Sequence, residues 1–213
     1  MNAFSADTFS RIPLIGILRG YGKEQIHHIL ETYILAGLST IEITWNTPHA
    51  ADIIGESVER YGRRLNIGAG TVCSEAHLDQ ALACGAQYIV TPVLNLSVIS
   101  RCKELGVPIF PGAYTPSEIY SAWEAGATMV KVFPAGCLGP DYIQQVKAPL
   151  DTIQLLPTGG IKLENMEAYL KAGANGFGLG SALFPDRFIH GKDWDGLKKH
   201  LERFVSCWEK AGK

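Results

Sequence analysis

The chain has 213 residues, of which 46% are hydrophobic and 19% charged, and its formal net charge is −2. This composition predicts a folded protein with a sizeable core and excludes a disordered chain. The nearly neutral charge, without a basic cluster, argues against nucleic acid as the main partner. No stretch approaches about 18 uninterrupted apolar residues, and residues 1–10 lack the layout of a signal peptide, so we expect no membrane span.

The cysteines and histidines give no sign of a metal site or a disulfide framework. The five cysteines are scattered along the chain without a C-x-x-C motif, and the six histidines show no ligand spacing. This pattern is typical of reduced thiols in the cytoplasm. We therefore expect a cytoplasmic protein that uses neither a metal nor an organic cofactor.

Short apolar runs recur along the chain and predict β-strands. In chain order they cover residues 13–18, 40–45, 66–71, 88–92, 108–113, 129–134, 153–160 and 176–180. Their starts are 20 to 27 residues apart, which leaves room for one helix and two short loops each time. Most of the intervening segments have helical periodicity, and strands that alternate with helices predict right-handed βαβ units and a parallel sheet.

A glycine recurs at the joint between a predicted helix and the following strand. A glycine there ends a helix in the left-handed conformation and turns the chain back into the sheet. The glycines at these joints are Gly37, Gly85, Gly106, Gly126 and Gly173. Eight repeats of this kind predict a single-domain α/β protein over residues 1–213, a (β/α)8 TIM barrel. A doubly wound sheet is the alternative, although no G-x-G-x-x-G follows the first strand.

A lysine interrupts the sixth apolar run. Lys131 lies between Val130 and Val132, in a run that reads as a strand buried on both faces. An unpaired buried ammonium is costly in free energy. The lysine therefore either lies on a solvated edge of the sheet or has a function. Burial lowers the pKa of a lysine, and a neutral amine can form a Schiff base with a carbonyl.

Polar residues lie within or at the ends of the other runs too. In a barrel of this kind, active sites lie at the C-terminal ends of the strands. The polar residues expected there are Arg19, Glu42, Thr44, Thr71, Thr91, Lys131 and Thr158. Side chains alternate along a strand, so Glu42 and Thr44 face the interior, and Glu42 can approach Lys131 from the opposite side.

The pair of Glu42 and Lys131 has two interpretations. One is a buried structural salt bridge, which would not require threonines and an arginine at the same rim. The other is catalysis. A lysine amine is normally protonated at neutral pH, and burial lowers its pKa and so favours the neutral amine. A glutamate whose pKa is raised to about 6–7 could then move protons beside it.

The last two predicted strands end in glycine-rich turns. Residues 158–160 are Thr-Gly-Gly, and Gly180-Ser181 follows the next strand. Small residues let backbone N–H groups approach an anion, and these two loops commonly bind phosphate in barrels. A phosphorylated substrate is therefore expected.

Seven short segments match the motifs of one known family in the same order: 41–44, 67–71, 89–92, 110–112, 130–134, 156–160 and 178–181. Through them the chain resembles, from about Ile12 to Ala182, the KDPG/KHG aldolases, which are class I aldolases. These enzymes cleave 2-keto-3-deoxy-6-phosphogluconate to pyruvate and glyceraldehyde 3-phosphate, a step of the Entner–Doudoroff pathway. Each segment is short, but their common order and spacing make the match specific.

The resemblance implies a role for each matching residue. Lys131 would form the Schiff base, and Glu42 would act as general acid and base through a water. Thr71 would help to hold the pyruvyl carboxylate, and Pro92 and Phe133 would shape the pocket together with Thr44 and Asn46. The phosphate would be bound by Thr158, Gly159, Gly160, Gly180 and Ser181. A homotrimer is expected, with a phosphorylated 2-keto-3-deoxy sugar acid and pyruvate as its small-molecule partners.

Two departures from the family pattern bear on the substrate. Some members have an arginine four residues after the glutamate, where this chain has Asn46; others have one at the end of the first strand, which Arg19 matches. We therefore assign carboxylate binding to Arg19. Asn46 and Arg19 also resemble the 2-keto-3-deoxy-6-phosphogalactonate aldolases of the family, which tend to have valine where this chain has Thr158. The Thr158 hydroxyl favours the gluconate epimer.

Three hypotheses stay open at this point. Lys131 is the nucleophile of an aldolase, or it anchors a carboxylate or phosphate in an isomerase-type barrel. In the third, the chain is a catalytically silent barrel that binds a sugar phosphate.

Overall fold

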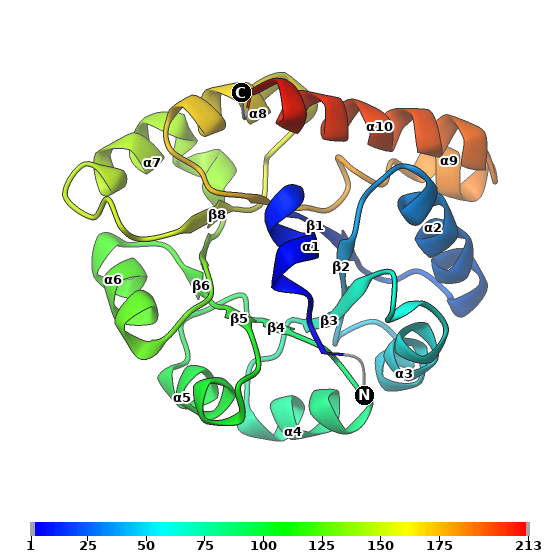
Figure 1. Cartoon of the computed structure of the whole chain (residues 1–213), viewed down its shortest axis with the longest axis horizontal. Helices are drawn as coiled ribbons and strands as arrows, with labels where there is room; N and C mark the ends of the chain where they lie inside the picture. Colours follow the sequence, from blue (N-terminus) through cyan, green and yellow to red (C-terminus); the bar gives the residue numbers. More distant parts are fainter. Residues whose placement is uncertain (1–2, 212–213) are drawn as a thin grey trace.

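The computed structural model describes residues 3–211, which form an α/β fold with helices surrounding parallel strands (Figure 1). The strands are β1 Leu14–Leu18, β2 Thr40–Thr44, β3 Asn66–Gly70, β4 Ile89–Val90, β5 Ile109–Phe110, β6 Gly112–Ala113, β7 Val130–Val132, β8 Leu155–Pro157 and β9 Phe177–Leu179. The helices are α1 Ala6–Arg11, α2 Lys23–Leu35, α3 Ala50–Tyr61, α4 Glu75–Ala83, α5 Leu96–Leu105, α6 Pro116–Ala125, α7 Gly139–Lys147, α8 Leu163–Lys171, α9 Asp186–His190 and α10 Trp194–Ala211, with a 3-10 turn at Ala135–Cys137.

The strands pair in two parallel sheets. One has the order β5-β4-β3-β2-β1-β9 and the other the order β6-β7-β8. A single bridge between Thr158 and Gly178 links the end of β8 to β9. Each expected apolar run contains a strand, and the alternation of strands and helices is confirmed.

The predicted strand over 108–113 is two strands in the structure, with Pro111 between β5 and β6. A proline has no N–H to donate to a neighbouring strand, so strand pairing is interrupted there. Its carbonyl oxygen still accepts a hydrogen bond from Lys131 N at 2.9 Å. The chain therefore passes from one sheet to the other across a single residue.

The glycine joints are confirmed. All five glycines have positive φ, from 65° at Gly106 to 111° at Gly126. Thr115 caps the start of helix α6, since its hydroxyl accepts from Glu118 N at 3.3 Å and the Glu118 carboxylate accepts from Thr115 N at 2.8 Å.

Apolar residues pack on both faces of the sheets. The larger cluster lies between the strands and the helices, and a smaller one lies on the inner face, the face turned away from the surrounding helices. The smaller cluster contains Phe9, Ile15, Tyr88, Val90, Phe110 and Leu156. Helix α1 lies across the centre of the strands and brings Phe9 to within 5.3 Å of the Phe110 ring centroid (Figure 1).

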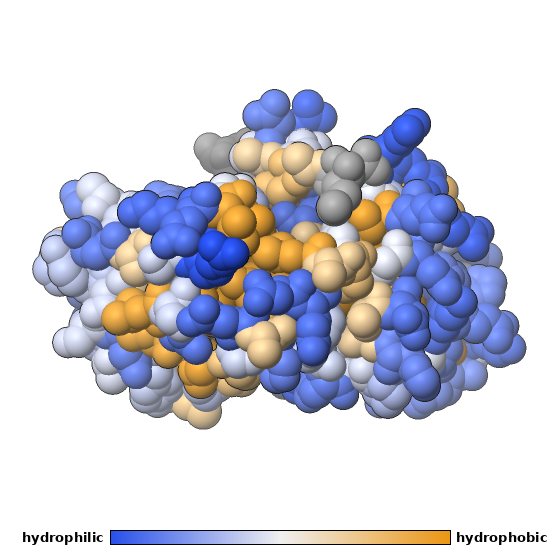
Figure 2. Space-filling model, turned by 90° about the horizontal axis from the view of Figure 1, so that it is seen from below, coloured by the Kyte–Doolittle hydropathy of each residue, from blue (hydrophilic) through white to orange (hydrophobic). Residues whose placement is uncertain are grey.

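Some hydrophobic side chains remain on the surface. On the side that carries α4, they gather across the centre of the face (Figure 2). Within residues 3–211, the large hydrophobic side chains with high exposure are Leu35, Val93, Leu96, Leu105, Tyr114 and Tyr120. No helix in that range is both long and apolar enough to cross a membrane.

Candidate active site

Lys131 is buried in the middle of β7, as the sequence predicts. Its side chain is only 6% exposed, and its neighbours Val130 and Val132 are fully buried. In the sheet it lies between Gly112 of β6 and Leu156 of β8. Burial lowers the pKa of Lys131, and Arg19 lowers it further, while the carboxylate of Glu42 opposes the shift.

Glu42 is buried in β2 and is 1% exposed. Its carboxylate carbon lies against Gly70 of the neighbouring strand, where a Cβ atom would be 2.6 Å away. Glycine at position 70 therefore leaves the space that the carboxylate occupies. Burial raises the pKa of Glu42, and the positive charges of Lys131 and Arg19 oppose this.

Glu42 and Lys131 act on each other's charge without forming a close ion pair. Each shifts the pKa of the other, yet no ion pair within 4.0 Å joins them in the described part of the chain. A buried structural salt bridge is therefore not what this pair forms. Burial moves both groups toward their neutral forms, a neutral amine and a protonated carboxyl.

A cavity of about 400 Å³ opens at the C-terminal ends of β1, β7, β8 and β9. Seven of the predicted site residues line it: Arg19, Phe133, Thr158, Gly159, Gly160, Gly180 and Ser181. Phe133 connects the cavity to the buried lysine, since its ring centroid lies 5.3 Å from Lys131 Nζ. Parallel strands place their carboxyl ends together, which is why residues far apart in the sequence meet here.

The glycine-rich turn after β8 has a backbone that favours glycine. Gly159 and Gly160 have φ values of 82° and 80°, and a Cβ at position 160 would lie 2.7 Å from the Cα of Gly136. Thr158 is 3% exposed and donates its hydroxyl hydrogen to the carbonyl of Leu156 at 3.2 Å. That hydroxyl therefore has only its lone pairs left for a ligand.

Four further predicted residues lie at the same end of the strands but do not line this cavity. Thr44 is buried, Asn46 is exposed, and Thr71 and Pro92 are half-buried. Thr71 has a φ of 62°, a left-handed conformation that is uncommon for a threonine. The structure thus brings the predicted phosphate loops together with Arg19 in one cavity, which is lined neither by these four residues nor by Lys131 and Glu42.

Thr47 is a site residue that the sequence reasoning missed. It is 4% exposed, and its hydroxyl accepts a hydrogen bond from Gly20 N at 3.0 Å and lies 3.1 Å from the Thr44 hydroxyl. It thereby fixes the backbone next to Arg19 to the end of β2. The contact joins two loops, and no local pattern indicates it. Lys162, which lines the cavity two residues after Gly160, could have been found as a cation beside a glycine-rich turn.

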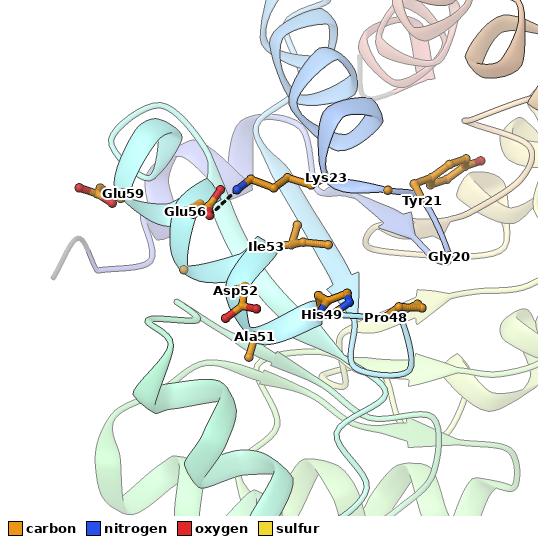
Figure 3. Close-up of a pocket in the computed structure, with 12 residues that line it drawn as sticks. Gly20, Tyr21, Lys23, Pro48, His49, Ala51, Asp52, Ile53, Glu56 and Glu59 are labelled. Carbon is orange, nitrogen blue, oxygen red and sulfur yellow. Dashed lines mark hydrogen bonds and ion pairs between the residues drawn. The ribbon is translucent and has the colours of Figure 1, made fainter.

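A larger cavity, of about 650 Å³, lies outside the candidate site between the loop after β1 and helix α3 (Figure 3). Asp52, Glu56 and Glu59 line it, and Lys23 Nζ pairs with Glu56 Oε1 at 2.5 Å. No predicted site residue lines it, and none of its lining residues within 3–211 is a buried nucleophile. Size alone therefore does not identify the site. Tyr21 lines both cavities.

Among residues 3–211 the site has neither a disulfide nor a cluster of metal ligands, although Cys73 is close enough to Lys131 to raise its pKa. All five cysteines are free, and no group of three or more histidine, cysteine, aspartate or glutamate residues within 3–211 is arranged to hold a metal ion.

Known proteins resemble the chain over nearly its whole length. The sequence profile of the family described as "KDPG and KHG aldolase" matches residues 6–200. The chain is 38% identical over 203 residues to 2-dehydro-3-deoxy-6-phosphogalactonate aldolase of Escherichia coli (strain K12), covering 95% of this chain and 97% of that protein. It is 36% identical over 197 residues to 2-dehydro-3-deoxy-phosphogluconate aldolase of Haemophilus influenzae, covering 91% and 92%.

Solved structures agree in fold. The structure titled "Native KDPGal structure" superimposes with a TM-score of 0.88 at 34% identity, covering 99% of this chain and 98% of that one. KDPG aldolase from Legionella pneumophila, whose title describes pyruvate captured as a covalent carbinolamine, has a TM-score of 0.84 over 92% of this chain and 95% of its own. At 24% identity, the latter supports the fold alone. Aldolases are lyases, and the chain belongs to the KDPG and KHG aldolase family.

Proposed function

We propose that this protein is a class I aldolase that reversibly cleaves 2-keto-3-deoxy-6-phosphogluconate to pyruvate and glyceraldehyde 3-phosphate. The observation that carries the proposal is Lys131, a buried lysine whose pKa is lowered by burial and which forms no ion pair within 4.0 Å with a carboxylate of residues 3–211. A lowered pKa increases the neutral fraction of the amine, and the neutral amine is the form that attacks a carbonyl carbon.

The reaction follows from the two buried groups. The Lys131 amine attacks the C2 carbonyl, and loss of water leaves an imine that is protonated on nitrogen. A base then takes the proton of the C4 hydroxyl, the C3–C4 bond breaks, and its electrons pass into the imine to give an enamine and the aldehyde. Protonation of C3 and hydrolysis release pyruvate and restore the lysine. Glu42, with its raised pKa, is the proposed acid and base in these steps, acting through a water.

Substrate contacts are proposed for the surrounding residues. Arg19 binds the carboxylate as a guanidinium can, with two hydrogen bonds, and Thr71 assists it. The turns at 158–160 and 180–181 hold the phosphate through their backbone N–H groups. Lys162 adds a positive charge at the same cavity. Thr44, Asn46, Pro92 and Phe133 shape the space around the imine.

The galactonate epimer is the second candidate substrate. Two observations favour it: Asn46 follows β2 in place of an arginine, and relatives at 38% and 35% identity bear the 6-phosphogalactonate name. Thr158 favours the gluconate epimer, although its hydroxyl donates to Leu156. Both epimers yield the same two products, so the chemistry at Lys131 is common to both. Comparing kcat/KM on the two acids decides between them. A higher value for the galactonate acid would overturn the proposal that 2-keto-3-deoxy-6-phosphogluconate is the substrate.

The two sheets are proposed to form one closed (β/α)8 barrel, in a single domain over residues 1–213. The bridge from Thr158 to Gly178 and the one-residue step at Pro111 support closure at the two places where the sheets meet. The first two and the last two residues of that range lie outside the described residues. We also infer a cytoplasmic homotrimer that acts on small molecules.

Reductive trapping tests the aldolase function. Incubation with pyruvate and borohydride should add a reduced pyruvyl group to Lys131, which mass spectrometry of peptides locates. If pyruvate binds without labelling Lys131, the lysine is an anchor rather than a nucleophile. If pyruvate does not bind and neither acid is cleaved, the chain is a silent sugar-phosphate barrel. The Lys131→Met variant is the control for labelling at other lysines.

A further inference from the structure

Tyr88, the residue before β4, has a buried hydroxyl without a hydrogen-bond partner among residues 3–211. The side chain is fully buried on the inner face, where its ring packs against Phe4 at 5.4 Å and Phe110 at 5.5 Å between centroids. Most buried hydroxyl groups in folded proteins have a partner, and one without a partner costs free energy. The hydroxyl of Tyr88 therefore calls for a functional explanation.

The ring of Tyr88 reaches across β3 toward β2. A Cβ at Gly68 would lie 2.5 Å from the Cζ atom that carries the hydroxyl, so the end of the ring covers this glycine. Gly68 is also the sheet partner of Glu42. The Glu42 carboxylate lies over Gly70, the next inner position of the same strand. Two glycines of β3 thus leave room for a phenol on one side and a carboxylate on the other.

Glu42 has an unsatisfied atom of its own. Its Oε2 is buried and has no hydrogen-bond partner within 3–211. A buried donor and a buried acceptor therefore lie over neighbouring positions of β3 without bonding to each other. A single water molecule between two such groups would satisfy both, as buried waters commonly do.

We propose that Tyr88 is a positioning residue for Glu42, donating a hydrogen bond through one bound water to Glu42 Oε2. The inference rests on the proposed aldolase function, in which Glu42 moves the protons. The hydrogen bond holds the carboxylate over Gly70 and stabilises its ionised form, the form that can accept a proton.

The charges around Glu42 agree with this role. Lys131 approaches from β7 and Arg19 from the end of β1, and both favour the ionised carboxylate. Burial and the nearby Glu42 charge raise the pKa of Tyr88 well above its ordinary value, and Tyr33 from α2 acts in the same direction. Tyr88 therefore stays protonated over the working pH range and remains a donor. Cys73, which follows β3, raises the pKa of Lys131.

The test is Tyr88→Phe, measured on the exchange of the pyruvate C3 protons with solvent deuterium. This half-reaction requires the imine and a base but no aldehyde, and NMR follows it directly. We expect the exchange rate to fall about tenfold, the value of a hydrogen bond to a charged group. The acidic limb of its pH profile should move to higher pH, because the ionised form of Glu42 loses a donor. An unchanged rate and an unchanged acidic limb would overturn the inference.

Two controls separate this inference from the function on which it rests. Borohydride trapping of pyruvate on Lys131 should be the same in Tyr88→Phe and in the wild type; a wild type that is not labelled refutes the aldolase function instead. Tyr169→Phe removes another buried hydroxyl, one that donates to the Ala135 carbonyl at 3.0 Å, and should leave the acidic limb in place.

If Tyr88→Phe does not fold, 3-fluorotyrosine at position 88 keeps the shape of the side chain and is a stronger hydrogen-bond donor. It should move the limb to lower pH, and no shift would refute the proposal.

Discussion

At the scale of single residues, burial determines the charge of the two central groups. Lys131 and Glu42 are both almost fully buried, and their pKa values move in opposite directions, downward for the lysine and upward for the glutamate. Each pKa shift also makes the stability of the fold depend on pH, because the same groups have their ordinary pKa values in the unfolded chain. Function and stability are therefore linked at these two positions.

Replacing Lys131 by methionine should abolish turnover without lowering the free energy of unfolding at pH 7. The folded protein disfavours the ammonium, so the wild type binds fewer protons when folded than when unfolded between the lowered pKa and the ordinary 10.5. Wild-type stability should therefore rise with pH through that window, and Lys131→Met should lack this rise. Urea unfolding at pH 7 and pH 9 measures both effects. Lys199→Met, at an exposed position on α10, is the matched control. A large loss of stability at pH 7 in Lys131→Met would mean that the ammonium is stabilised by Glu42.

Replacing Glu42 by glutamine should separate proton transfer from imine formation. We expect kcat to fall by about 10²–10⁴, the usual contribution of a general acid or base. Pyruvate and borohydride should still label Lys131. The Glu42 charge raises the pKa of Lys131, so its removal should let labelling extend to lower pH. Steady-state kinetics and a pH series of trapping experiments measure this, and a variant that turns over at the wild-type rate would exclude Glu42 from the chemistry.

At the scale of elements, the sequence predicts the strands well because their signal is local. Apolar runs, glycines in the left-handed conformation and a threonine cap each depend on a few neighbouring residues. The prediction of one strand over 108–113 was wrong at Pro111, where a proline cannot donate to a sheet and so interrupts the pairing. Contacts between loops are different. The hydrogen bond from Gly20 N to Thr47 joins residues 27 positions apart, and nothing near Thr47 in the sequence indicates it.

Thr47→Val should weaken substrate binding more than it slows catalysis. The hydroxyl holds the loop after β1, and losing it frees the backbone next to Arg19, the proposed carboxylate ligand. We expect KM for the keto acid to rise about tenfold, as for the loss of a buried hydrogen bond, with kcat nearly unchanged. Thr32→Val is the control, because the Thr32 hydroxyl donates to His28 O within α2. Equal KM values for Thr47→Val and the wild type would show that Arg19 does not depend on this contact.

At the scale of the whole molecule, topology explains which site residues could be predicted. Parallel strands bring Arg19, Thr158 and Gly180 to one cavity, so their positions follow from the strand pattern alone. How far each side chain reaches across the inner face of the sheet does not follow from that pattern. Tyr88 reaches the neighbourhood of Glu42 only because Gly68 has no side chain, and this depends on the register of three strands. Side-chain packing across strands is thus the part of the site that the sequence leaves open.

The surface of the molecule leads to a prediction about assembly. Five exposed hydrophobic side chains lie within α5 and α6 or on the segments that lead into them, and these two helices pack side by side: Val93, Leu96, Leu105, Tyr114 and Tyr120. Apolar surface gathered on neighbouring elements is stabilised by contact with a partner, and a second copy of the chain is the partner expected for a homotrimer.

Leu96→Glu should therefore lower the molar mass in solution from three chains of 23.2 kDa to one, as measured by light scattering after size-exclusion chromatography. A buried, unpaired carboxylate at a contact between chains opposes association, whereas the same charge on a free surface costs little. Leu35→Glu is the matched control, because Leu35 is 68% exposed at the end of α2 and Leu96 is 53% exposed. The control should keep the mass of the wild type. A wild type that elutes as a single chain would refute the trimer, and a trimeric Leu96→Glu would place the contact elsewhere on the surface.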